Sequence, residues 1–75
     1  MNRTTRNKIS ELTVNLESIS SQLETFAEFE REKFDKLSDE AAEGEAGQAI
    51  EAAADALEAA VAQLANAIDD LTGIE

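Results

Sequence analysis

Residues 50–71 read IEAAADALEAAVAQLANAIDDL, and their larger apolar residues recur at alternating intervals of four and three. This spacing is typical of one apolar face of an α-helix. We call this set the leucine row, and its members are Ile50, Ala54, Leu57, Val61, Leu64, Ile68 and Leu71. The stretch therefore predicts a long helix that packs along this row against another helix.

A second set of small residues lies beside the leucine row. Four alanines recur every seven residues, and we call them the alanine row: Ala46, Ala53, Ala60 and Ala67. Successive helical residues are rotated by about 100°, so the two rows lie roughly 90° apart. A helix with two apolar faces needs two neighbours, and this chain has room for one other long helix. The alanine row therefore predicts a contact with another chain.

The first helix carries an apolar row of its own. It consists of Ile9, Leu12, Leu16, Ile19, Leu23 and Phe26. The next positions in this register are Glu30 and Lys33, and the apolar pattern resumes at Phe34 and Leu37. Such a shift is a stutter, an insertion of four residues that locally unwinds a supercoil. Glu30 then lies within the row, either bending outward to be neutralised by Lys33 or a partner chain, or fixing the register by a polar contact.

The break between the two helices lies in residues 38–45. Thr4 or Thr5 is expected to cap the first helix, which spans about residues 4–37. Ser38 or Asp39 is expected to stop it and to cap a single short turn. Gly44 is expected to end this turn in a left-handed conformation, before a second helix over about residues 46–72. The chain is thus predicted to be all-α, with residues 1–75 forming one domain, an antiparallel helical hairpin.

Antiparallel pairing places Leu37 near Ile50, Phe26 near Val61 and Leu16 near Leu71. The second helix ends there, so about twelve N-terminal residues have no partner within the chain. Together with the alanine row, this overhang predicts self-association, most simply a dimer that forms a four-helix bundle, or a higher oligomer. The expected interface residues are Ile9, Leu12, Ala46, Ala53, Ala60 and Ala67.

The charge of −11 is unevenly distributed. Residues 1–10 carry three bases and no acid, whereas residues 11–75 carry three bases and seventeen acids. An anionic body repels phosphate backbones and anionic membranes, so neither duplex nucleic acid nor a membrane is an expected partner. A protein with a basic surface is an expected partner. The acidic face that would meet it consists of Glu51, Asp55, Glu58 and Asp69. The simpler interpretation is that acidity keeps an alanine-rich helix soluble.

The basic segment at the N-terminus contains Arg3, Arg6 and Lys8. Arg3 and Arg6 share a helix face next to free backbone amides, where anions bind readily. One interpretation is that this segment lies against the acidic body of another protomer. The alternative is a small phosphorylated ligand, such as a cyclic nucleotide, held between protomers.

Catalytic and cofactor chemistry is not expected. The chain has no histidine or cysteine, so its serines lack an activating base and a zinc site is not expected. No metal and no cofactor is predicted, and the protein is not expected to be an enzyme. No apolar run approaches the length of a membrane span or a signal peptide, which predicts a cytoplasmic location.

Residues 37–74 begin LSDEAAEGEAGQAIEAAADALEAA. Over roughly residues 28–74, the chain resembles small acidic helical-hairpin proteins encoded by bacteriophages, prophages and mobile elements. The shared features are a Glu-rich first helix, a short acidic turn before glycine, and a second helix rich in Ala, Ile, Leu, Asp and Glu. The resemblance implies a protein that binds and modulates a protein of the host, in the host cytoplasm. Two other functions remain open: a counter-defence oligomer that sequesters a nucleotide signal at its basic ends, and a structural part of an assembly.

Overall fold

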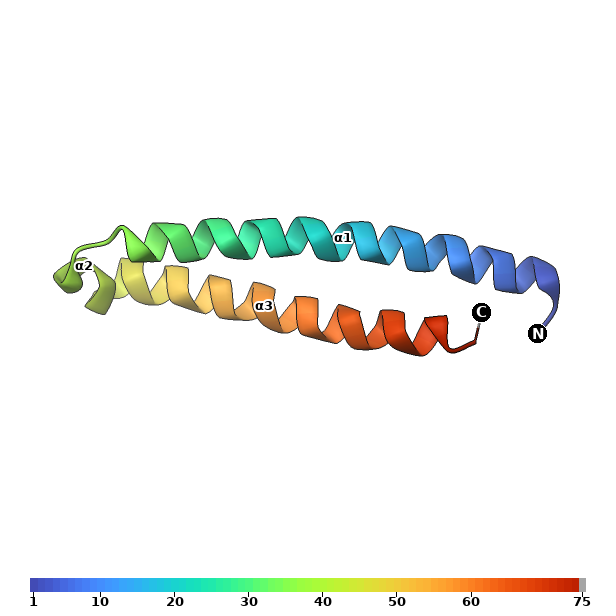
Figure 1. The fold of residues 1–75 in the computed structure, drawn as a ribbon. Coiled ribbons are helices and arrows are strands. Elements are labelled where there is room, and N and C mark those ends of the chain that lie inside the picture. Colours follow the sequence, from blue (N-terminus) through green and yellow to red (C-terminus); the bar gives the residue numbers. More distant parts are fainter. Residues whose placement is uncertain (75) are drawn as a thin grey trace.

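The computed structural model describes residues 1–74, which form three helices. They are α1 (Arg3–Asp35), α2 (Asp39–Glu43) and α3 (Glu45–Thr72). α1 and α3 lie side by side in opposite directions, and the short α2 joins them (Figure 1). The described residues contain no strand, so the all-helical prediction is confirmed. We call α1 and α3 together the helix pair, a rod with extents of 58 × 14 × 13 Å.

α1 begins two residues after the N-terminus because Asn2 caps it. The Asn2 Oδ1 accepts a hydrogen bond of 2.8 Å from the backbone amide of Thr5. This side chain satisfies one of the amides that lack a partner in the first turn of a helix. The prediction of Thr4 or Thr5 as the cap is therefore wrong, and both threonines lie inside α1.

The connection is a single helical turn, α2, capped by Ser38. The Ser38 Oγ accepts from the amide of Ala41 at 3.2 Å, as one of the two predicted caps. Gly44 ends α2 with extended backbone at φ −81° and ψ −177°. The left-handed conformation predicted for Gly44 is therefore absent, and none of the described residues has a positive φ.

Gly47 is the glycine on which the connection depends. It is buried in the first turns of α3, where α2 folds back against it. A Cβ atom at residue 47 would overlap the backbone carbonyls of Ala41 and Ala42. Only a residue without a side chain allows α2 to approach α3 this closely.

The leucine row is the less exposed row of α3. All seven members of the leucine row are buried or half-buried. Ala54 is fully buried, so the helices come close at this level of the pair. The described part of the chain contains no large side chain that is fully buried, because two helices cover only one face of each other.

α1 uses a different row from the one predicted. The sequence pattern predicts that Leu12, Ile19 and Phe26 contact α3, but all three are exposed. The residues that follow them, Thr13, Ser20 and Ala27, are the less exposed ones. The less exposed row of α1 runs Ile9, Thr13, Leu16, Ser20, Leu23, Ala27, Glu30 and Phe34, and Leu37 continues it two residues after the helix ends. These residues alternate by four and three from end to end, so the contact has no stutter. The expected neighbour of Val61 is accordingly Ala27, not Phe26, and both line one groove.

Two polar residues in this row are satisfied locally. Thr13 is only 3% exposed, and its hydroxyl donates to the carbonyl of Ile9 at 2.8 Å. Glu30 is half-buried, and its Oε1 accepts from the Nζ of Lys33 at 3.0 Å. Since Lys33 lies on the same helix, the pair neutralises Glu30 without a contact to α3. The structure thus has the first of the two arrangements expected for Glu30.

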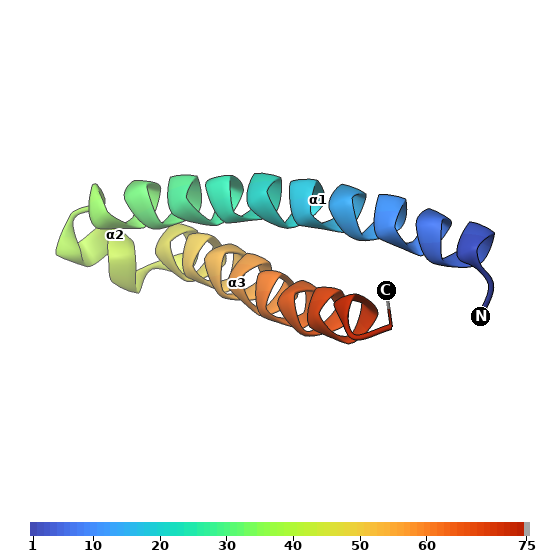
Figure 2. The same ribbon diagram turned by 45° about the vertical axis from the view of Figure 1, so that its right-hand side comes forward.

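The N-terminal end of α1 projects beyond the C-terminal end of α3 in two views (Figures 1 and 2). This projection carries the basic segment, and Arg3, Arg6 and Lys8 are all exposed. Ile9, the residue after Lys8, is half-buried.

Candidate interaction surfaces

Arg31 joins α1 to α3 on one side of the helix pair. Its Nε and Nη2 donate to the two carboxylate oxygens of Glu58 at 3.2 and 2.6 Å. The same Nη2 donates to Asp55 Oδ1 at 2.6 Å. The planar guanidinium suits this two-point geometry, which a lysine cannot reproduce.

This contact changes the ionisation of Glu58. Hydrogen bonds from Arg31 stabilise its charged form and hold the pKa of the Glu58 carboxyl below its usual value. The same hydrogen bonds raise the pKa of the Arg31 guanidinium, so this residue stays charged. Glu58 is therefore an anion at neutral pH.

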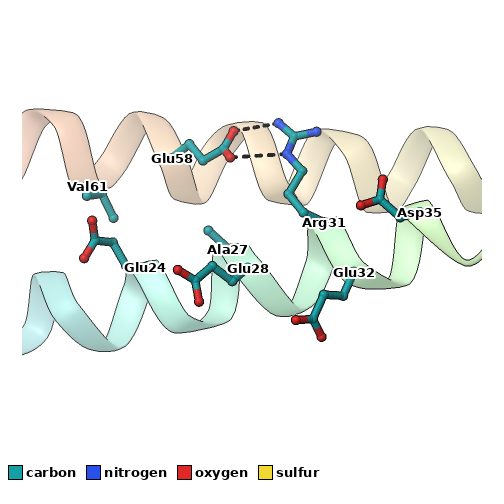
Figure 3. Close-up of a pocket in the computed structure, with 8 residues that line it drawn as sticks. All are labelled: Glu24, Ala27, Glu28, Arg31, Glu32, Asp35, Glu58 and Val61. Atoms are coloured by element: carbon teal, nitrogen blue, oxygen red, sulfur yellow. Dashed lines mark hydrogen bonds and ion pairs between the residues drawn. The ribbon is translucent and has the colours of Figure 1, made fainter.

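An acidic groove lies beside this ion pair (Figure 3). It has a volume of about 460 Å³. Ala27 and Val61 contribute its apolar lining between the helices, and Arg31 is its one base. Five carboxylates complete the lining: Glu24, Glu28, Glu32, Asp35 and Glu58. Such a groove favours cationic groups and repels phosphates.

The other side of the helix pair is apolar. Leu12, Ile19 and Phe26 each precede a residue of the α1 contact row by one position, and the alanine row does the same on α3. In two antiparallel helices, residues one position before the contact lie on the same side of the pair, about 100° from it. Arg31 and Glu58 each follow a contact residue (Glu30 and Leu57) by one position, so their ion pair marks the opposite side.

The side chains on this apolar side are large and exposed. Leu12, Ile19, Phe26 and Phe29 are 58, 46, 55 and 50% exposed. Phe26 and Phe29 contact each other edge to face, with ring centroids 6.3 Å apart. We call these four residues, together with the alanine row, Ala49 and Ala56, the apolar side.

The residues predicted for an oligomer interface fall mainly on the apolar side. Leu12, Ala46, Ala53 and Ala67 are exposed there and Ala60 is half-buried, whereas Ile9 lies in the α1 contact row. Ile19 and Phe26 have larger side chains and also lie on the apolar side. The sequence pattern predicts them in the contact with α3, and that prediction is wrong. The sequence does contain a signal that places these two residues outside the contact. Counting back from Leu37 and Phe34 in steps of three and four residues reaches Ala27 and Ser20, not Phe26 and Ile19.

The predicted acidic face is divided by the structure. Glu51, Asp55, Glu58 and Asp69 are all exposed, but Asp55 and Glu58 bind Arg31 and are partly neutralised. The groove carboxylates on α1 add to this face, and sequence reasoning did not assign them to it. None of the ion pairs among residues 1–74 involves Arg3, Arg6 or Lys8.

Residues 1–74 hold no cluster of acidic residues with the geometry of a metal site. Over the same residues, no helix combines the length and the hydrophobicity that crossing a bilayer requires. No protein-family model matches the sequence, and neither curated proteins nor solved structures gave a match.

Proposed function

We propose that this protein is a small self-associating interaction module without catalytic activity. One observation carries the proposal: the helix pair has an apolar side with exposed phenylalanines and an opposite side lined with carboxylates. In the proposed arrangement, the apolar side joins copies of the chain and the acidic side binds another protein.

Self-association is supported by the size of the exposed side chains. Leu12, Ile19, Phe26 and Phe29 expose about half or more of their surface, and residues 1–74 form only two long helices that could cover them. Burying apolar area is worth about 25 cal/mol per Å². A chain of 75 residues has a small core of its own, so such burial contributes a large fraction of its stability. An antiparallel helical hairpin that forms a four-helix bundle dimer meets this need with the fewest copies.

The acidic groove supports a partner with a basic surface. Glu24, Glu28 and Glu32 lie on three successive turns of α1, where they present carboxylates to the same groove. The resemblance to bacteriophage and mobile-element proteins supports a setting in the host cytoplasm, with a host protein as the partner. Binding would then block or modulate a surface that normally meets an anion, such as nucleic acid.

A capture experiment with a matched variant tests this function. The protein is immobilised and exposed to bacterial lysate at low and at high salt. We expect proteins with basic surfaces to be retained at low salt and released at high salt, because screening weakens exposed charge pairs. The variant Glu24→Gln/Glu28→Gln/Glu32→Gln keeps helix propensity and removes three charges, so it should lose the same proteins. Equal retention by the variant would contradict the proposal.

A second function has its own observation. The basic segment with Arg3, Arg6 and Lys8 is exposed and projects past the end of α3. Its chemistry suits a cyclic nucleotide, whose phosphates pair with guanidinium groups. A cyclic nucleotide that raises the midpoint of thermal unfolding of the wild type, but not of Arg3→Gln/Arg6→Gln, would favour this sequestering function over the interaction module.

A further inference from the structure

The apolar side is almost free of acid in a chain that has seventeen acidic residues. Helical spacing places lysines at the two ends of its α1 row, and Asp70 is the one carboxylate that it places on this side among the described residues. Two copies with a charge of −11 can therefore meet face to face on this side while their carboxylates stay apart. A repulsion that opposes contact elsewhere on the surface is absent here.

We infer that the apolar side is covered by a second copy of this chain, related by a twofold axis parallel to the helices. α1 of each copy then packs on α3 of the other, and both α2 turns lie at the same end of the dimer. This inference rests on the proposed self-association, and it adds the contact surface and the orientation of the copies.

The shape of the apolar side is complementary to the same surface on a second copy of the chain. The Arg31–Glu58 pair sets the levels of the two helices. Within one helical turn, Phe26 then lies level with Ala60, and Ile19 with Ala67. Large residues thus line the α1 edge of the surface and small residues line the α3 edge. A twofold axis parallel to the helices places each large row against the partner's small row, so that the volumes are complementary.

Residues further out on this side agree with the same orientation. Phe29 of one copy comes near the level of Ala56 of the other, and Gln22 near the level of Gln63. An aromatic ring thus meets a small apolar residue, and two amides that can hydrogen-bond meet each other. The same register places Lys33 of one copy at the level of Ala53 of the other.

A twofold axis perpendicular to the helices fits less well. With the axis at Ile19, the middle of the large row, Ala46 and Ala53 extend past the end of the partner's α3 and stay uncovered. With the axis at Phe26, Lys33 of each copy meets Ile19 of the other, a larger apolar side chain than the Ala53 that it meets about the parallel axis. The parallel axis is the arrangement that covers the apolar side along the whole of α3.

The first experiment compares two apolar residues that are each more than half exposed, on opposite sides of α1. Phe26 is 55% exposed on the apolar side, and Val14 is 63% exposed next to the acidic side. Phe26→Glu should convert the dimer to a monomer in sedimentation equilibrium, whereas Val14→Glu should leave the mass unchanged. Ile19→Glu is a second variant with the same expected loss, and circular dichroism checks that each variant stays helical.

The second experiment measures the orientation. The chain has no cysteine, so Glu40→Cys in α2 carries a single spin label per copy. A parallel axis brings the two labels to the same end of the dimer, within about 30 Å of each other given helix spacings of 8–10 Å. A perpendicular axis at Ile19 separates them by about 60 Å, because each lies about 30 Å along the rod from the axis.

The outcomes separate this inference from the proposed function. A dimer with a short label distance that Phe26→Glu dissociates supports it. A dimer with a long distance, or one that Val14→Glu and Phe26→Glu affect equally, overturns the inference and leaves self-association intact. A wild type that stays monomeric at micromolar concentration overturns both, whereas salt-sensitive capture through the acidic groove would still stand.

Discussion

Arg31 of α1 and Glu58 of α3 lie 27 positions apart in the sequence and are joined by two hydrogen bonds across the helix pair. This contact carries information that the apolar rows lack. A row that repeats every seven residues packs almost equally well after a shift of one heptad. Such a shift would separate the side chains of Arg31 and Glu58 by about 10 Å. The ion pair therefore favours one register.

Arg31→Ala should lower the midpoint of thermal unfolding. The change removes the contacts to Glu58 and Asp55 and leaves two carboxylates near each other. The loss should be larger at low salt, since salt screens exposed charges. Lys36→Ala removes the same charge from an exposed position outside these ion pairs and is the control. Equal losses for the two variants would mean that net charge, not the cross-helix pair, matters.

Glu58→Gln should change how stability depends on pH. The folded pKa of Glu58 lies below its ordinary value of 4.5, so its stabilisation is present above pH 4.5 and is lost as the pH falls through the folded pKa. The difference in free energy of unfolding between wild type and variant should therefore be largest near pH 7 and shrink under acid. Urea unfolding at a series of pH values measures it. Glu51→Gln, an exposed control, should show a smaller and flatter difference, and a steeper one would refute the assignment.

Gly47→Ala should destabilise the connection. The added methyl group overlaps the carbonyls of Ala41 and Ala42, and overpacking of this kind costs about 1–3 kcal/mol. Gly44→Ala is the matched control, because a Cβ there meets its nearest atom at 3.5 Å and φ is negative. Chemical denaturation of both variants checks the prediction. It fails if Gly47→Ala is as stable as Gly44→Ala.

Ala60→Arg should block assembly. The long charged side chain prevents close approach on the apolar side and would leave a charge in the contact. Ala62→Arg places the same residue on the outer face of α3 and should leave the mass unchanged. Light-scattering mass of the wild type and both variants measures this. If Ala60→Arg assembles as well as Ala62→Arg, the alanine row is not part of an interface.

The fold was largely predictable because α3 has only one row of large apolar residues. The choice was harder on α1, where Leu12, Ile19 and Phe26 form a more hydrophobic row than Thr13, Ser20 and Ala27. Hydrophobicity alone predicts that the first row forms the contact with α3. The second row forms it, because this row continues without a break into Phe34 and Leu37. A straight contact along the full length of α3 outweighs the burial of three larger side chains at one end.

The candidate surfaces were less predictable because they depend on that choice. Exposing Phe26 instead of Ala27 creates the apolar side and opens the acidic groove on the opposite side. The contact of Arg31 with Asp55 and Glu58 requires the register of the two helices, which no local pattern contains. Gly47 was also missed, since a glycine within a helical pattern gives no sign of the segment that packs against it.

The close approach of α2 to Gly47 has a consequence for how the chain folds. Near this turn, residues that meet are close in sequence, whereas the start of α1 and the end of α3 are separated by almost the whole chain. Closing a short loop costs less entropy, so pairing should start at α2 and progress toward the termini like a zipper. Unzipping then begins at the two chain ends, and amide hydrogen exchange should slow steadily from the N-terminal overhang toward Ile50.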